Sequence, residues 1–232
     1  MIKYYLIHGV DKTRGPRMIN EFNKWGLNNT DVKWILSPNK HEITDEMRKQ
    51  LLMQCASLSC GNFVFSGCPN INNGVVSCTY KHYLCLKDII DNNYAYGVIM
   101  EDNIFFCENI PNTVNKYINQ LNELYPHWDV LFDTKWKSVK DINEIDEKNI
   151  RDDILVYPKS NEITKYCHGA TRLGQFYIIT NNCAHKLFNE YIPFNNAPDW
   201  WMNDLFRKLH INSYWSEPSI TDVYPHVSTV FC

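Results

Sequence analysis

The stretch that most constrains the fold is YGVIMEDNIFF, residues 96–106, in which an apolar run ends abruptly at two carboxylates and an amide. A short continuous apolar run, here residues 98–100, is typical of a strand that is buried on both faces. In open α/β sheets the ligand crevice lies beyond the carboxyl ends of the strands, so we expect Glu101, Asp102 and Asn103 on the floor of such a crevice. Hard oxygen ligands suit Mn²⁺ or Mg²⁺, and a diphosphate is a natural ligand of either cation.

Strand and helix patterns alternate along the rest of the chain. Short apolar runs predict strands at residues 3–10, 32–36, 128–132 and 173–180. Apolar residues at helical spacing predict helices at residues 18–26, 44–55, 75–90, 111–125, 183–191 and 200–209. This alternation predicts an α/β fold, with a largely parallel sheet and helices on both of its faces. No repeat or linker divides residues 1–232, so we expect a single domain.

Local signals add detail to this pattern. Thr44 and Asn181 are the predicted N-caps of the helices that follow them. Residues 61–74 are rich in Gly, Asn and Pro and are predicted to be a loop. Residues 134–165 are rich in charge, which favours either a mobile lid or a surface excursion. The tail from Asn212 onward contains two prolines and is predicted to be a strand followed by ordered coil.

Composition excludes several classes of partner. The 232 residues carry a net charge of −3 without a basic block, so nucleic acid is not an expected partner. No apolar run approaches the roughly 20 residues that a membrane-spanning helix needs, and the N-terminus does not resemble a secretion signal. We therefore expect a cytoplasmic location, or else a domain of a longer or viral protein.

The nine cysteines are odd in number and irregular in spacing, which favours reduced thiols. Cys78, His82 and Cys85 have the i, i+4, i+7 spacing of one helix face, where a metal could bind. Because no C-x2-C pair accompanies them, a buried helix face is the preferred interpretation.

The order of these motifs resembles glycosyltransferase family 25, which contains bacterial lipooligosaccharide glycosyltransferases and collagen hydroxylysine galactosyltransferases. YYLIHGVDKTRGPRM is similar to the family's opening strand and arginine-bearing loop, and YGVIMEDNIFF to its Leu-Glu-Asp-Asp-Val strand end. SCTYKHYLCL is similar to a Gly-Cys-x-x-Ser-His helix, although Ser77 and Lys81 stand where Gly and Ser are usual. The later blocks of the resemblance are WDVLFD, GQFYIITNNCAHKLF, APDW and EPSITD.

The resemblance implies a Rossmann-like sandwich of the GT-A type and an inverting transfer of a hexose from a UDP-sugar. The implied acceptor is a hydroxyl of a glycan or of a hydroxylysine-type protein side chain, as in lipopolysaccharide biosynthesis or protein glycosylation. The residues implied to bind the nucleotide-sugar are Ile7, His8, Arg14, Arg17, Glu101 and Asp102.

The implied metal ligands for Mn²⁺ or Mg²⁺ are Glu101, Asp102 and Asn103, with His226 as a late fourth ligand and His168 as its rival. Asn103 departs from the family, which has an aspartate there, but an amide oxygen can still coordinate a hard cation with less charge. An inverting displacement also needs a base for the acceptor proton. Asp199 is the first candidate for that base and Asp204 the second.

Two other functions stay open at this point. Asn103 is compatible with an inactive or weakly active relative that binds a nucleotide-sugar or a partner protein. A nucleotidyltransferase that makes activated sugars shares the fold class, and it predicts a glycine-rich basic loop after the first strand. HGVDKTRGPR supplies the basic residues of such a loop but a poor glycine pattern.

Overall fold

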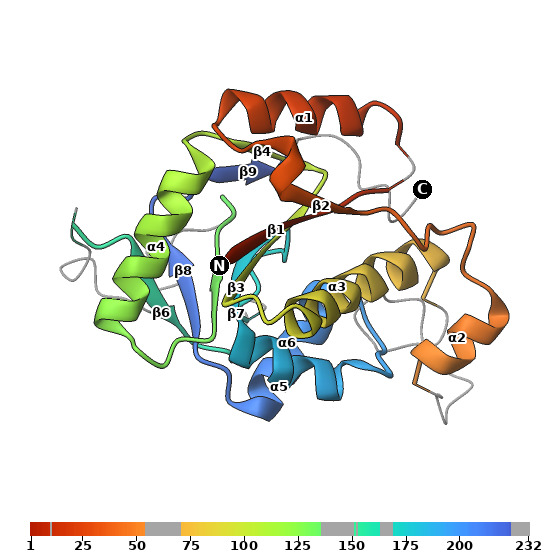
Figure 1. The fold of residues 1–232 in the computed structure, drawn as a ribbon. Coiled ribbons are helices and arrows are strands. Elements are labelled where there is room, and N and C mark those ends of the chain that lie inside the picture. Colours follow the sequence, from red (N-terminus) through yellow and green to blue (C-terminus); the bar gives the residue numbers. More distant parts are fainter. Residues whose placement is uncertain (10, 54–70, 136–150, 152, 163–168, 224–232) are drawn as a thin grey trace.

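The computed structural model describes residues 1–9, 11–53, 71–135, 151, 153–162 and 169–223. These residues form a seven-stranded sheet with helices on both faces (Figure 1), in the strand order β2-β1-β3-β7-β5-β8-β6. The expected α/β sandwich is therefore confirmed. The strands are β1 (Ile2–Ile7), β2 (Val32–Ile35), β3 (Tyr96–Glu101), β5 (Val130–Phe132), β6 (Val156–Lys159), β7 (Phe176–Thr180) and β8 (Ser213–Ser216).

The sheet is mostly parallel, as the alternation of elements predicts. Strands β2, β1, β3, β5 and β8 run in one direction, whereas β7 and β6 run in the other. A separate two-stranded sheet pairs β4 (Ile104–Phe106) with β9 (Thr221–Val223). It ties the segment after β3 to the part of the tail that follows β8.

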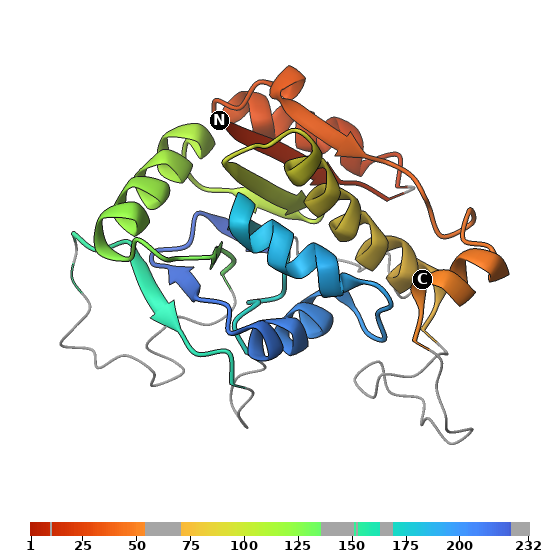
Figure 2. The ribbon, with the colours of Figure 1, turned by 60° about the horizontal axis from the view of Figure 1, so that its bottom comes forward.

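Helices α1 (Arg14–Lys24) and α4 (Ile110–Leu124) cover one face of the sheet, and α3 (Asn73–Asp91), α5 (Asn181–Tyr191) and α6 (Pro198–Leu209) cover the other (Figure 2). Alternate residues of β3 pack into the hydrophobic cores on the two faces of the sheet. Ile99 packs on the side of α3, α5 and α6, and Val98 and Met100 pack on the side of α1 and α4. Burial on both faces explains the continuous apolar run of this strand.

The helix starts show where local signals succeed and fail. Thr44 is the N-cap of α2 (Asp45–Leu51), and its side chain accepts a 3.2 Å hydrogen bond from the backbone of Met47, as predicted. The prediction of Asn181 as an N-cap is wrong, because Thr180 caps α5 through the backbone N–H of Cys183. Asn181 is already helical, and its amide donates instead to the carbonyl oxygen of Tyr94.

Two predicted irregular segments contain regular structure. Within residues 134–165, the described β6 pairs with β8 at the edge of the sheet, so this part belongs to the main fold. At the end of the predicted loop 61–74, Asn73 already begins α3 with Asn72 as its N-cap. Residues 61–70, 136–150, 152 and 163–165 of these two segments lie outside the described residues.

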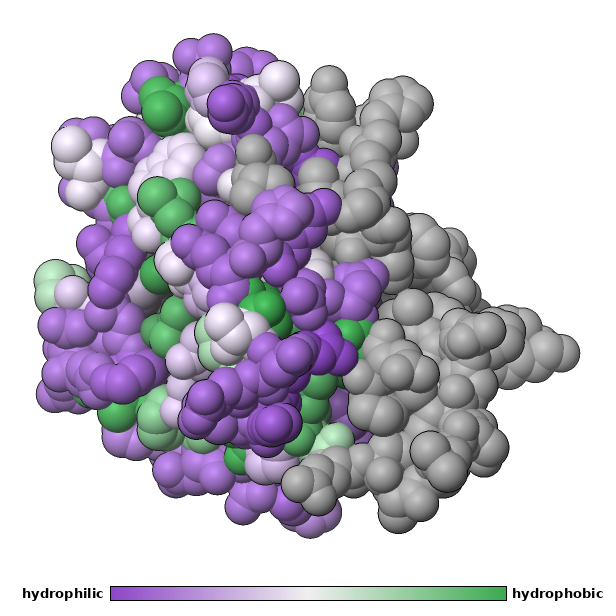
Figure 3. Space-filling model, turned by 90° about the vertical axis from the view of Figure 1, so that its right-hand side faces the viewer, coloured by the Kyte–Doolittle hydropathy of each residue, from purple (hydrophilic) through white to green (hydrophobic). Residues whose placement is uncertain are grey.

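The register places three strand ends at one edge of the sheet. Ile7 pairs with Ile35 of β2 on one side and with Glu101 of β3 on the other. The antiparallel β7 begins at the same edge, because Phe176 pairs with Met100. Figure 3 faces the side of the molecule where β1 and β2 end, and the described side chains on it are predominantly hydrophilic. Among the described residues, no helix combines the length and apolar character needed to cross a membrane.

Candidate active site

A pocket lies at the carboxyl ends of β1 and β3. In the strand order β2-β1-β3, the chain leaves β1 toward β2 on one side and later returns to form β3 on the other, so this is a topological switch point, the usual ligand crevice of an open α/β sheet. The sheet side of the pocket is lined by Ile7, His8, Gly9, Glu101, Asp102 and Asn103. The helical side is lined by Arg14 of α1 and by Gly74, Ser77, Cys78 and Lys81 of α3, and the segment between β2 and α2 adds Asn39 and Lys40.

Asp102 is the centre of a dense network on one wall of this pocket. Its Oδ2 accepts hydrogen bonds from His8 Nδ1 at 2.7 Å and from the backbone of Gly9 at 2.9 Å, and its Oδ1 accepts one from Arg14 Nη1 at 2.7 Å. Burial opposes ionisation of Asp102, but these three donors and the Arg14 charge hold the pKa of its carboxyl below the usual value. Asp102 is therefore a charged anchor that accepts three hydrogen bonds between β1, β3 and α1.

Arg17 holds the backbone of Asp102 in place. Its Nη1 donates to the carbonyl oxygen of Ile104 at 2.7 Å, and its Nη2 donates to the carbonyl oxygen of Asp102. Arg17 thus holds the backbone of the turn after β3, and it is not among the residues that line the pocket.

Glu101 points to a second group of side chains on α3. Its Oε1 lies 3.3 Å from His82 Nε2 and 3.8 Å from Cys78 Sγ, and the ligand atoms of these three residues all lie within 4.8 Å of one another. His82 Nδ1 lies 2.8 Å from the hydroxyl of Tyr177. Such a group could bind a metal that prefers nitrogen and sulfur ligands, such as Zn²⁺. Cys85, the third member of the predicted helix face, lies in the core and is not part of this group.

Asp199 stands in the first turn of α6 and interacts electrostatically with Glu101. Burial raises the pKa of Asp199 to about 7; the backbone amide of Trp200 opposes this increase, and the negative charge of Glu101 adds to it. A carboxyl with a pKa near 7 can exchange a proton at neutral pH, which is the property that a general base needs. The role of Asp199 as the base stays a prediction, since Asp199 is not among the residues that line the pocket.

The segment before β7 packs directly against Asp199. A Cβ atom added to Gly174 would lie 3.3 Å from the Cβ of Asp199, and Gly174 has a φ of +70°, which favours glycine. Arg172 and Leu173 also have positive φ, so three consecutive residues adopt a conformation that is costly for side chains other than glycine.

Buried polar contacts hold this segment in place. Asn203 Oδ1 of α6 accepts hydrogen bonds from the backbone of Ala170 at 2.9 Å and of Thr171 at 3.3 Å. The indole of Trp215 donates to the carbonyl oxygen of Ala170 and stacks on the guanidinium of Arg172 at 4.6 Å. The segment that packs against Asp199 is thereby held by α6 and β8.

The three predicted metal ligands fit a single hard cation poorly. The two carboxylate oxygens of Asp102 already accept hydrogen bonds from His8, Gly9 and Arg14. Glu101 turns toward Cys78 and His82. The buried Oδ1 of Asn103 accepts no hydrogen bond among the described residues, but it belongs to a neutral amide. A Mn²⁺ or Mg²⁺ ion bound by all three would have to share Asp102 with Arg14 and His8 and would turn Glu101 away from His82.

The structure brings most of the predicted site residues together. Ile7, His8, Arg14, Glu101, Asp102 and Asn103 line the pocket. Asp204 does not join them: it is 42% exposed on α6 and pairs with Arg207. His168 and His226 lie outside the described residues.

Sequence reasoning missed Asn39, Lys40 and Lys81 as pocket residues. The signal for Lys81 was present, because this lysine stands where the resembled family has a serine, inside a helix that otherwise buries its face. Asn39 and Lys40 carried no pattern, since they belong to an irregular segment between β2 and α2.

Comparison with solved structures finds distant likenesses. A197 from STIV has 9% identity over 93% of this chain and 81% of that chain, with a TM-score of 0.42. A putative glucose-1-phosphate thymidylyltransferase from Bacillus anthracis in complex with a sucrose has 8% identity over 95% and 89%, with a TM-score of 0.40. The apo form of mouse xyloside xylosyltransferase 1 has 7% identity over 90% and 82%, with a TM-score of 0.33.

No curated protein matches the chain at a significant level. The family model described as glycosyltransferase family 25, LPS biosynthesis protein, matches residues 18–202. That range includes β3, the α3 side chains of the pocket and Asp199. The chain therefore belongs to glycosyltransferase family 25.

Proposed function

We propose that this glycosyltransferase is an inverting hexosyltransferase with a GT-A-type fold, which uses a UDP-sugar donor. Its acceptor would be a hydroxyl of a glycan or of a hydroxylysine-type protein side chain. The observation that carries this proposal is Asp199, whose pKa is about 7 and which interacts electrostatically with Glu101 and Cys78, two residues that line the pocket between β1 and β3.

The pocket suits the diphosphate part of such a donor. Arg14, Lys40 and Lys81 bring positive charge to its walls, and Gly74 lies in the first turn of α3. A helix N-terminus and cationic side chains both favour phosphate oxygens. The donor would place its diphosphate here and its sugar toward Glu101 and Asp199.

Inverting transfer then needs one base on the side of the sugar away from the diphosphate. The acceptor oxygen forms a bond to the anomeric carbon while the bond from that carbon to the diphosphate oxygen breaks, and the electron pair leaves with UDP. Asp199 takes the proton of the acceptor hydroxyl. Asp204 is less suited to this role, because it is exposed and paired with Arg207.

The sequence also proposes Mn²⁺ or Mg²⁺ at Glu101, Asp102 and Asn103, with His226 as a further ligand. If bound there, the cation would offset the charge of the departing diphosphate. Because the donor set fits such a cation poorly, the assay includes Mn²⁺ as a variable.

The test is nucleotide release from a panel of UDP-, GDP- and CMP-sugars in the presence of candidate acceptors, with and without Mn²⁺. We expect release from one UDP-sugar, and a decrease in kcat of at least about 100-fold in Asp199→Asn. The matched control is Asp204→Asn, an Asp-to-Asn change on the same helix, which should retain wild-type activity. Wild-type activity in Asp199→Asn would contradict the assignment of the base.

One observation favours a second candidate, a nucleotide-sugar binding module with little turnover. Asn103 replaces the expected aspartate, and its amide oxygen is buried without a partner among the described residues. In that case calorimetry would detect UDP binding while all donors stay intact, and Asn103→Asp would raise the activity. An unchanged activity in Asn103→Asp would argue against this second candidate.

A further inference from the structure

We propose that Lys81 and Arg14, rather than a divalent cation, neutralise the diphosphate of the donor, so that nucleotide binding and sugar transfer are independent of metal. This inference rests on the proposed function, because it concerns how the same pocket holds its nucleotide.

Asp102 serves as a partner for cationic side chains of the protein. Its side chain is 8% exposed and that of Arg14 is 11% exposed, and their 2.7 Å contact lies within the pocket wall. A divalent ion on Asp102 would lie beside the guanidinium of Arg14, and the repulsion between the two positive charges opposes metal binding at this carboxylate.

The remaining metal ligands of the pocket are too few for a hard cation. Mn²⁺ and Mg²⁺ prefer several oxygen ligands, usually including carboxylates. Glu101 shares its Oε1 with His82 and Cys78, and Asn103 contributes a neutral amide. The pocket therefore offers no pair of open carboxylates among its described residues.

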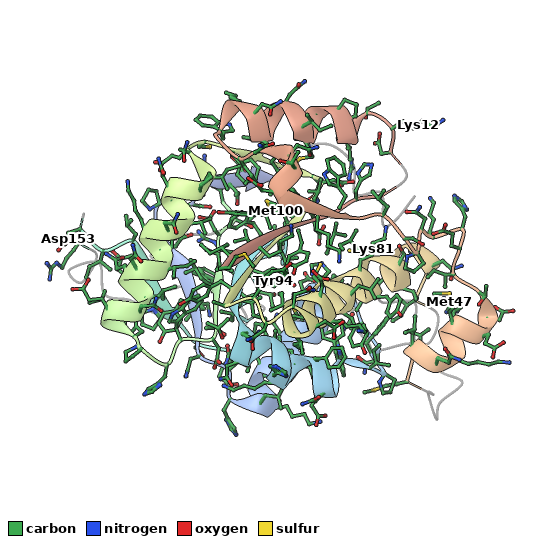
Figure 4. All side chains as sticks on the ribbon, in the orientation of Figure 1. Lys12, Met47, Lys81, Tyr94, Met100 and Asp153 are labelled. Carbon is green, nitrogen blue, oxygen red and sulfur yellow. The ribbon has the colours of Figure 1, made fainter. Side chains whose placement is uncertain are left out.

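Lys81 reaches the pocket from α3 (Figure 4). This lysine lies on the side of α3 that faces β1, and its side chain is buried, with 2% of the residue exposed. Its ammonium donates to the carbonyl oxygen of His8 at 2.7 Å and to Asn39 Oδ1 at 3.1 Å. Both acceptors are neutral, so they orient the ammonium without cancelling its charge.

An ammonium group has three N–H donors, and these two acceptors use two of them. The third N–H remains for a ligand, as far as the described residues show. Burial lowers the pKa of Lys81, and the neighbouring Cys78, Asp102 and Glu42 act in the opposite direction. A bound diphosphate would further favour the charged form, because it places negative oxygens next to the ammonium.

Lys81 and Arg14 together form a cationic binding site for the leaving group. As the bond between the anomeric carbon and the diphosphate oxygen breaks, the electron pair moves onto that oxygen. Lys81 from α3 and Arg14 from α1, which both line the pocket, then stabilise the charge, and Asp102 holds Arg14 in position.

The first experiment measures UDP binding by calorimetry in excess EDTA and again with Mn²⁺. We expect the wild-type dissociation constant to agree within about threefold between the two conditions. Lys81→Met should weaken UDP binding in EDTA by at least about tenfold, because it removes one charge-assisted contact. Lys87→Met on the exposed side of the same helix is the matched control and should bind as the wild type does.

The wild-type comparison stands even where Lys81→Met does not fold, which circular dichroism would reveal. UDP binding that requires Mn²⁺ would overturn the inference. UDP binding that is lost in EDTA and recovered with Zn²⁺ alone would also overturn the inference, because it would point to a cation at Cys78, His82 and Glu101. Unchanged binding in a folded Lys81→Met variant would also overturn it.

The second experiment repeats nucleotide release from the productive sugar in EDTA. Equal turnover with and without Mn²⁺ supports the inference, and turnover only with Mn²⁺ overturns it. Lys81-dependent UDP binding without turnover of any donor would contradict the proposed function. It would still support Lys81 and Arg14 as the binding site of the diphosphate. Absence of UDP binding under both conditions would contradict both.

Discussion

Arg14 Nη1 donates a 2.7 Å hydrogen bond to Oδ1 of Asp102, and this contact joins the start of α1 to the turn after β3. The two side chains are 11% and 8% exposed, so little water screens their charges. His8 completes the anchor from the end of β1. The pair therefore fixes the relative position of three elements that meet at the pocket.

Arg14→Met is expected to destabilise the fold, because Asp102 would keep its buried charge without its main counter-ion. Loss of one partner of a buried pair costs about 3 kcal/mol in free energy of unfolding. The measurement is urea unfolding followed by circular dichroism. Arg207→Met breaks the exposed pair with Asp204 and should cost less than about 1 kcal/mol. Equal losses in the two variants would refute the assignment of Asp102 as an anchor.

Most of the fold was predictable from the sequence, because the cores on both faces of the sheet leave a local trace in it. The apolar run of β3 and the helical spacing of Met18 and Phe22 in α1 reflect burial against neighbours on one or two faces. The cap of α5 was not predictable to the residue. Thr180 and Asn181 both have side chains suited to the role, and the end of β7 decides between them.

The site was predictable in its membership more than in its contacts. A strand end with consecutive acids indicates a crevice, and Glu101 and Asp102 do lie there. Their separate partners depend on tertiary packing: His8 and Asp102 are 94 positions apart in the chain. Helical periodicity likewise grouped Cys78 with His82, but the third member of the group is Glu101 from β3 instead of Cys85.

The pH dependence of transfer is expected to follow Asp199. Burial and the charge of Glu101 raise the pKa of its carboxyl to about 7, and the base is active only when ionised. The value of kcat/KM should therefore rise with pH and level off above about pH 8, with a midpoint near 7.

Glu101→Gln tests the electrostatic part of this explanation. It removes a negative charge close to Asp199, so the pKa of Asp199 falls and the rising limb moves to lower pH. Glu190→Gln, on the surface of α5, is the control and should leave the midpoint in place. A midpoint that moves to higher pH in Glu101→Gln would contradict the proposed coupling.

Asn203→Ala is expected to loosen the segment that packs on Asp199. The change leaves the backbone N–H groups of Ala170 and Thr171 without their acceptor in a buried environment, at a cost of about 2 kcal/mol or more. Hydrogen exchange should be faster at these two amides. Steady-state kinetics should show a lower kcat. Asn182→Ala, at an exposed position of α5, should change neither quantity. Unchanged protection of both amides would show that Asn203 does not hold the segment.

Gly97→Ala is expected to disturb the contact between β3 and α3. A Cβ atom at position 97 would lie 2.2 Å from Cδ1 and 2.9 Å from Cγ1 of Ile89, so the side chain of Ile89 must move within a packed core. The cost in free energy of unfolding should be about 1–3 kcal/mol. Ile89→Val removes Cδ1 and by itself costs about 1 kcal/mol. Because it also removes the atom that the new methyl group meets, the double variant should be more stable than the sum of the two losses, by about 1 kcal/mol. Strict additivity in urea unfolding would mean that Gly97 is needed for a reason other than the approach of Ile89.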